Sequence, residues 1–332
     1  MGRHARGGRN WEGFSLDLYL AGVAMNESIF GIQGASVQAT SKHYIGNEQE
    51  TQRVPYARED GTVIEAISAN IDDPTFYKLY IWPFANAVHA GTASVICGYR
   101  RVNGSYSCAN PDILSAILKD EFAFPGYIMS DWDATHSTVG TANAGLDMEM
   151  PGNQTVSGIY YFGDSLADTI RAGNVSSGRL DNMATRVMVP YFRLGQDKDF
   201  PEPDPSSGAA FLTYTYGHES PLATLYPAVP TRDVRANHAR GIRELGAAGT
   251  VLLKNLNGTL PLSNETSFSL FSNDLPDPTL SSVYLVYGDN AMGNQIGTLN
   301  IGGGSRTVRH TSLISPLEAI RSKIRSLGSR AQ

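Results

Sequence analysis

Short apolar runs alternate with helix-like segments up to about Leu194, and this alternation limits the fold more than any other feature of the sequence. Strands that alternate with helices form βα units, whose consecutive strands run parallel to one another. The sequence therefore predicts a parallel sheet in its first part. The expected strands are residues 37–44, 93–99 and 127–129, and the expected helices lie within 55–89, at 113–118 and at 180–194. Within 55–89, one helical face is predicted from Phe76, Leu79, Ile81, Phe84, Ala87 and Val88.

The regular alternation ends at a segment rich in proline and serine, residues 200–208. Such a composition is typical of a linker, and we expect the linker to cover residues 200–233. A second α/β region is predicted after it, with helices at 235–246 and 316–327 and strands at 250–255 and 282–288. This region is short for a complete doubly wound domain with two covered faces. The expected organisation is domain 1–199, linker 200–233 and the start of a second domain, 234–332.

The composition is that of a soluble globular protein, with 41% hydrophobic and 17% charged residues. A net charge of −6 argues against nucleic acid and anionic membranes as partners. No apolar run approaches the roughly 20 residues of a membrane span. Residues 1–8 are basic and glycine-rich without an apolar stretch behind them, so no signal peptide is expected.

Cysteines and glycosylation motifs give mixed indications of the compartment. Cys97 and Cys108 flank a turn at 102–105, so they could form a local disulfide or remain two buried thiols. Two cysteines are too few for a zinc site. Six Asn-x-Ser/Thr motifs favour a secreted glycoprotein. They begin at Asn26, Asn103, Asn153, Asn174, Asn257 and Asn264.

Polar side chains follow the three predicted strands at the same relative place. Lys42 and His43 end the first strand, Tyr99 the second and Asp131 the third. In a parallel barrel all of them would meet at one mouth, where they could bind a polyhydroxylated substrate around a carboxylate. Trp132 would add a face on which a sugar ring stacks. Taken singly, each residue also has an ordinary interpretation: a helix-capping Asp, a solvated Lys, a core His and a packed Tyr.

Several blocks of the sequence resemble fungal β-glucosidases of glycoside hydrolase family 3, in the order of that family. The matching blocks are GRNWEGFS (8–15), KHYIGNEQE (42–50), MSDW (129–132), AGLDMEMPG (144–152), RLGQDKD (193–199) and VLLKN (251–255). The resemblance implies a partial TIM-type (β/α) barrel followed by the beginning of an α/β sandwich domain. It also implies a retaining β-glucosidase that acts on β-glucosides or cello-oligosaccharides, needs neither cofactor nor metal, and is secreted.

The resemblance assigns roles to six residues. Asp131 would be the nucleophile, while Arg9, Lys42, His43 and Tyr99 would bind the sugar hydroxyls and Trp132 would stack on the ring. Family β-xylosidases tend to have Ser-Asp-Cys where this chain has Ser-Asp-Trp, which favours glucose. The oligomeric state is left open.

Two large departures from the family pattern bear on activity, and two smaller ones touch the site. The family has more barrel before its Arg-Asn-Trp-Glu block, and its acid/base glutamate lies further along than this chain extends. Glu12, Glu48, Glu50 and Glu149 are the available substitutes, and none matches the family's acid. The alternative prediction is therefore an inactive remnant or sugar-binding fragment. Smaller departures are Arg100, which stands where an Asn is usual, and the loop at 302–306.

Overall fold

The computed structural model describes residues 2–4, 7, 9–152, 159–201, 233–261, 269–278, 297–298 and 312–326. The chain divides into two compact units, of which one comprises residues 1–198 and 271–319 and the other residues 199–270 and 320–332. Most of the expected linker, the expected strand at 282–288 and the loop at 302–306 lie outside the described residues.

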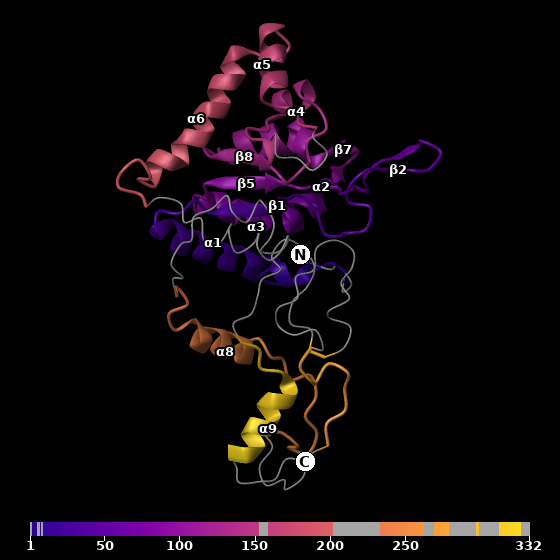
Figure 1. Cartoon of the computed structure of the whole chain (residues 1–332), viewed down its shortest axis with the longest axis vertical. Coiled ribbons are helices and arrows are strands. Elements are labelled where there is room, and N and C mark those ends of the chain that lie inside the picture. Colours follow the sequence, from indigo (N-terminus) through magenta and orange to yellow (C-terminus); the bar gives the residue numbers. More distant parts are fainter. Residues whose placement is uncertain are drawn as a thin grey trace, which may run out of the picture. The chain divides into compact units, whose positions relative to one another are not determined.

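A three-stranded parallel sheet lies in the first unit, in the order β1 (Thr40–Tyr44), β5 (Ser94–Cys97) and β8 (Tyr127–Ser130) (Figure 1). All four residues of β5 are buried, as expected for the central strand of a sheet that is covered on both faces. The α/β class and the parallel direction of the predicted strands are confirmed. The strands are shorter than predicted at 37–44 and 93–99.

Helices connect the strands and cover the sheet. Three of them begin at capping residues whose side chains accept backbone N–H groups of the first turn: Asp17 for α1, Asp72 for α2 and Ser176 for α6. The predicted helix at 180–194 is α6. The helices of the first unit's sheet region are α1 (Leu18–Gly34), α2 (Asp73–Thr75), η2 (Phe76–Tyr80), α3 (Trp82–His89), η4 (Asp112–Glu121), α4 (Val139–Ala144), α5 (Asp164–Arg171) and α6 (Ser177–Arg193).

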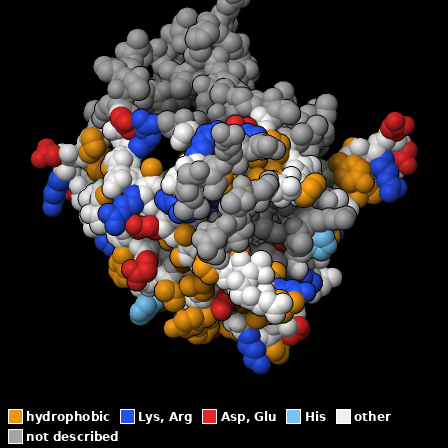
Figure 2. All heavy atoms as spheres, turned by 90° about the horizontal axis from the view of Figure 1, so that it is seen from below, with side chains coloured by type: hydrophobic (Ala, Val, Ile, Leu, Met, Phe, Trp, Pro, Cys, Tyr) orange, Lys and Arg blue, Asp and Glu red, His pale blue; other side chains and the backbone are white. Residues whose placement is uncertain are grey.

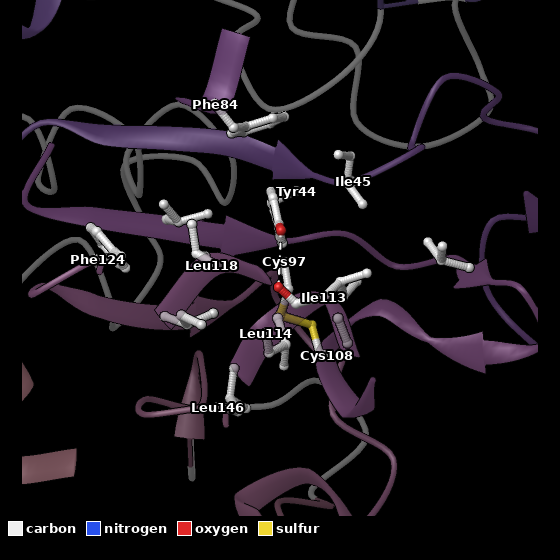
Figure 3. Close-up of a cluster of buried hydrophobic side chains, with 14 of the residues drawn as sticks. Tyr44, Ile45, Phe84, Cys97, Cys108, Ile113, Leu114, Leu118, Phe124 and Leu146 are labelled. Carbon is white, nitrogen blue, oxygen red and sulfur yellow. Dashed lines mark hydrogen bonds between the residues drawn. A yellow bond between two sulfur atoms is a disulfide. The ribbon is translucent and has the colours of Figure 1, made fainter. Parts of the chain in front are cut away.

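The core of this unit forms where the sheet meets these helices (Figure 3). Tyr44 is fully buried, packs edge-on against Phe84 with ring centroids 5.0 Å apart, and donates its hydroxyl hydrogen to the Ile113 carbonyl at 2.9 Å. Leu114 and Leu118 of η4 are also fully buried. Each such side chain contributes about 1.5–3 kcal/mol through burial, so the core fixes how the strands sit under their connecting loops.

A buried carboxylate ties the segment after β8 to two helices. Asp147 lies 2.7 Å from the ammonium of Lys119 on η4 and 2.8 Å from the guanidinium of Arg179 on α6, and it accepts the Ile128 N–H at 2.9 Å. Burial lowers the pKa of Lys119 to about 8, against the opposing effect of Asp147. This network, with partners on a strand and two helices, holds β8 in register with the helices behind it.

Two short pieces of sheet lie near the carboxyl ends of the strands. One is the hairpin of β2 (Tyr56–Ala57) and β3 (Val63–Ile64). The other is a three-stranded sheet with the strand order β4 (Ser68–Ala69), β6 (Arg101–Val102), β7 (Ser105–Tyr106). The hairpin projects from the surface, with apolar side chains near its base and charges at its tip (Figure 2). The helical pattern predicted within 55–89 is therefore confirmed only from Asp73 onward, because residues 56–69 form these strands instead.

Two further sequence predictions need correction. Leu79 was expected on the buried face of its helix but is exposed, because η2 has π-type geometry, which rotates the face away from the 3.6-residue period. The strand expected at 250–255 is wrong: these residues have no regular structure, and Leu253 is 92% exposed. No strand pairs with this run among the described residues. The remaining helices are η1 (Asn10–Glu12), η3 (Ser107–Ala109), α8 (His238–Ala248) and α9 (Pro316–Ser326).

Candidate active site

Asp131 follows directly after β8, so its carboxylate lies at the carboxyl end of the parallel sheet. Its Oδ1 accepts the backbone N–H of Trp132 at 2.8 Å, and its carbonyl accepts the N–H of Ala134 at 3.1 Å. The second bond closes a tight turn that carries Trp132, whose side chain is 47% exposed. The Asp131 side chain keeps 14% of its surface exposed and is therefore held in place while remaining accessible.

Lys42 and His43 both face the site although they are neighbours on β1. Successive side chains of a regular strand point to opposite faces, so one of the two would normally point away. The pairing of β1 with β5 changes register between Ser41 and Tyr44, and such an irregularity re-aims side chains. Both residues consequently line the same cavity.

His43 and Tyr99 surround the Asp131 carboxylate. His43 Nε2 lies 3.3 Å from Asp131 Oδ2, and the Tyr99 hydroxyl lies close enough to the same carboxylate for its charge to act on the tyrosine. Burial, followed by the charge of Asp131, raises the pKa of Tyr99 well above its ordinary value. The Tyr99 hydroxyl therefore stays protonated at neutral pH beside the carboxylate.

Arg9 and Lys42 are brought together by Glu12. Arg9 binds the Glu12 carboxylate through two bonds of 2.8 and 2.9 Å, and the Lys42 ammonium lies 3.7 Å from Glu12 Oε2. Burial acts to lower the pKa of Arg9, but Glu12, Glu50 and Asp131 outweigh it and raise it. The guanidinium therefore stays charged beside the site.

A cavity of about 120 Å³ joins these groups. Arg9, Glu12, Lys42, His43 and Glu48 are among the residues that line it. The structure thus brings together the predicted residues Arg9, Lys42 and His43 around one space, with Asp131 joined to it through His43 and Tyr99 beside Asp131. Charged donors that surround a small polar cavity suit a ligand with many hydroxyl groups.

Sequence reasoning missed two positioning contacts. Glu12 stands three residues after Arg9 on a 3-10 turn, and this spacing was a usable signal for an ion pair. Arg53 stacks on the ring of Tyr99, with its guanidinium carbon 4.5 Å from the ring centre, and pairs with Glu50 at 3.1 Å. No pattern in the sequence indicates the second contact, because Arg53 and Tyr99 belong to different loops.

The four carboxylates weighed as acid/base candidates differ in what they contact. Glu12 binds Arg9 and Lys42, Glu50 binds Arg53, and Glu149 accepts the backbone N–H groups of Tyr161 and Phe162. Both Glu48 oxygens are buried without a hydrogen bond from the described residues, and burial raises the pKa of Glu48. Three of the four are therefore engaged in holding structure.

Arg100 is almost fully buried where the family usually has an Asn. Its Nη1 contacts the Gly46 carbonyl at 3.4 Å, and burial lowers its pKa to about 10, with Glu50 and Glu48 opposing the change. The guanidinium remains charged at neutral pH and adds positive charge beneath the loop that follows β1.

Cys97 and Cys108 form a disulfide, which settles the alternative left open by the sequence (Figure 3). Cys97 ends β5 two residues before Tyr99, and Cys108 lies in the 3-10 turn that follows β7. The bond therefore ties both ends of the loop that presents Tyr99.

The site combines an accessible carboxylate with a tyrosine, a histidine, a lysine and an arginine at the carboxyl end of a parallel sheet. This is the chemistry of α/β hydrolytic enzymes that act on sugars, in which a carboxylate attacks carbon and cationic donors bind hydroxyls. The chain belongs to glycosyl hydrolase family 3: the model of the family's N-terminal domain matches residues 1–189.

Known relatives agree with this assignment. The chain is 47% identical over 346 aligned positions to a probable beta-glucosidase G of Neosartorya fischeri, covering all of this chain and 41% of the relative. It is 48% identical to the protein of that name from Emericella nidulans, over 97% of this chain and 40% of the relative. The chain thus spans about two fifths of the length of these relatives.

Solved structures show the same fold. A Chaetomium thermophilum beta-glucosidase is 40% identical with a TM-score of 0.81, over all of this chain and 39% of that one. A beta-D-glucoside glucohydrolase from Trichoderma reesei is 36% identical with a TM-score of 0.81, over all of this chain and 41% of that one.

Proposed function

We propose that this protein is a β-glucosidase that hydrolyses terminal β-D-glucosyl residues with retention of configuration, and that Asp131 is its nucleophile. The observation that carries the proposal is the position of Asp131, partly exposed at the end of β8, with His43 Nε2 at 3.3 Å from its carboxylate and Tyr99 beside it. The names of the relatives supply the substrate class.

In the proposed reaction, an oxygen of Asp131 attacks the anomeric carbon while the bond to the aglycone oxygen breaks. The aglycone oxygen leaves with the bonding electrons and takes up a proton. Water then attacks the same carbon, releases glucose and regenerates the carboxylate. His43 and Tyr99 flank the Asp131 carboxylate and orient it, while Arg9 and Lys42, held by Glu12, bind glycone hydroxyls. Trp132 stacks on the sugar.

The proposal is tested by covalent labelling with 2,4-dinitrophenyl 2-deoxy-2-fluoro-β-D-glucoside. Its leaving group needs little protonation, so the test does not depend on an acid/base residue. We expect a stoichiometric fluoroglucosyl adduct on Asp131, detected by peptide mass spectrometry. Asp133→Asn, an exposed carboxylate two residues away, is the matched control and should label like the wild type. Asp131→Asn should not label.

Each other outcome decides against part of the proposal. A label on a different residue would exclude Asp131 as the nucleophile. A wild-type chain that binds glucose without labelling would be the sugar-binding remnant. Faster labelling by the corresponding fluoroxyloside would indicate a β-xylosidase.

The finer fold and domain assignments belong to the same proposal. We infer that the three-stranded sheet is part of a TIM-type barrel within residues 1–199, followed by a linker at 200–233 and the start of an α/β sandwich at 234–332. The TM-scores of 0.81 with two fungal enzymes support this inference. Limited proteolysis tests it, since the first cuts should fall within 200–233 and leave residues 1–199 intact.

Secretion is proposed from the disulfide and the glycosylation motifs, since disulfides persist in oxidising compartments. No helix among the described residues is both long and apolar enough to cross a membrane.

The glycosylation motifs differ in accessibility. Asn174 and Asn257 are exposed, whereas the side-chain amide of Asn103 bonds both backbone groups of Ile71. Glycan mapping should therefore find the first two occupied more fully than Asn103. Asn26 is half-buried, and Asn153 and Asn264 lie outside the described residues.

A further inference from the structure

The turn that carries Trp132 is held by different contacts on its two sides. On one side Asp131 continues from β8, and the middle is fixed by the bond from Asp133 N–H to the Met150 carbonyl at 3.1 Å. On the other side the chain leads through Ala134 and Thr135, both buried, to His136. The far side of the turn is thus held by the burial of Ala134 and Thr135 and by the contacts of His136, the residue that follows them.

His136 lies against Tyr106, with ring centroids 4.0 Å apart and the ring planes tilted by 41°. The Tyr106 hydroxyl in turn donates a short hydrogen bond to the Glu65 carboxylate. Burial, followed by the bond to Glu65, raises the pKa of Tyr106 to about 12. Burial lowers the pKa of His136, so its ring favours the neutral form that stacks without a charge.

The three residues come from three different connections. Glu65 lies in the segment after β1, Tyr106 ends the hairpin after β5, and His136 lies in the loop after β8. Each of the three parallel strands thus contributes one member, all from segments that follow the strands' carboxyl ends. Contacts among these three residues therefore hold the three connecting segments in place relative to one another.

We propose that Glu65, Tyr106 and His136 form a latch that positions the Trp132 turn for sugar binding, an inference that rests on the proposed function. None of the three residues needs to touch the sugar; they are positioning residues. When the latch is intact, Trp132 is presented in one place, so less order has to be gained when a sugar stacks on it. When it is lost, the turn keeps Asp131 on β8 but Trp132 moves.

The test uses the full chain and the concentration dependence of labelling by the fluoroglucoside. His136→Ala and His136→Leu, which retains bulk without an aromatic face, should raise the half-saturating concentration about two- to tenfold. The maximal labelling rate should change by less than about twofold. His136→Phe should restore the wild-type value, because it keeps the stack. Phe192→Ala, which removes an aromatic pair on α6, is the control and should behave like the wild type.

The outcomes separate this inference from the proposed function. A wild-type chain that does not label on Asp131 would defeat the proposed function itself. If the wild type labels and both His136→Ala and His136→Leu match it, the latch is excluded. A lowered maximal rate at an unchanged half-saturating concentration would also overturn it, as would failure of His136→Phe to rescue binding.

Discussion

Two aspartates on either side of the loop after β8 show how the same side chain serves opposite purposes. Asp147 has no exposed side-chain surface, and its oxygens are occupied by Lys119, Arg179 and the Ile128 N–H. Asp131 keeps 14% of its side-chain surface exposed, with a backbone N–H on one oxygen and His43 Nε2 at 3.3 Å from the other.

The two aspartates differ in their exposure to solvent and in how many of their oxygen lone pairs are already hydrogen-bonded, and not in their charge. A carboxylate whose lone pairs are all bound by fixed donors inside the protein cannot approach a substrate carbon. A carboxylate held by a few donors at the edge of a cavity stays oriented and can still form a new bond. Asp147 therefore supports the fold on which Asp131 can act.

The largest expected effect is on stability, from Asp147→Ala. Two buried cations would lose their partner, so the free energy of unfolding should fall by about 3–5 kcal/mol. Asp131→Asn should change it by less than about 1 kcal/mol, because that side chain is partly exposed and its buried Oδ2 has no hydrogen bond from the described residues to lose. Denaturant unfolding followed by circular dichroism measures both. Equal losses from the two substitutions would break the comparison.

The next largest effect is expected from removing the disulfide, which supports the loop next to Asp131. Replacing Cys97 and Cys108 together by alanine should lower the free energy of unfolding by about 2–3 kcal/mol, as expected for a loop of this length. It should also slow labelling of Asp131, since Tyr99 lies in the closed loop. Unchanged labelling in the folded variant would show that Tyr99 is positioned by other contacts, such as Arg53.

A smaller effect is expected from Tyr99→Phe, which removes a hydroxyl beside Asp131 that can donate to its carboxylate. A hydrogen bond to a charged group contributes roughly 1.5 kcal/mol, so labelling should slow about tenfold. Tyr127→Phe is the matched control, because its hydroxyl binds Gln38 at the opposite end of β8. If both variants label at the same rate, the Tyr99 bond has no part in orienting the carboxylate.

The smallest effect concerns Glu48, whose pKa is raised by burial. The folded protein therefore holds this proton to a higher pH than the unfolded chain does, and stability falls as the pH rises between the two pKa values. Glu48→Gln lacks this proton. Its melting temperature relative to the wild type should therefore be higher at pH 7 than at pH 4. A difference that is independent of pH would contradict the raised pKa.

Much of the sheet region could be predicted because its signals are local. The strand at 127–130 and the helix α6 are each predicted from the pattern of residues within one segment, without reference to the rest of the chain. The strand expected at 250–255 shows the limit: an apolar run gives the propensity of a strand but not whether a neighbouring strand pairs with it.

The sequence was sufficient to predict which residues form the candidate site, but not the contacts that these residues make. Strand ends placed Lys42, His43, Tyr99 and Asp131 in one region, and the family resemblance added Arg9. The register change that turns both Lys42 and His43 to the cavity depends on pairing between distant segments. The stack of His136 on Tyr106 likewise joins separate loops, so no sequence pattern reveals it.

The projecting β2–β3 hairpin has a practical consequence for experiments. Its strands are two residues long, and Gly61 at its tip has a φ of +81° with open space around it. Exposed tips of this kind accept insertions with little cost to the fold. An epitope tag or a fluorophore placed at Gly61 would sit on the same connection as Glu48 and Arg53, which makes the hairpin a suitable position for a reporter of sugar binding.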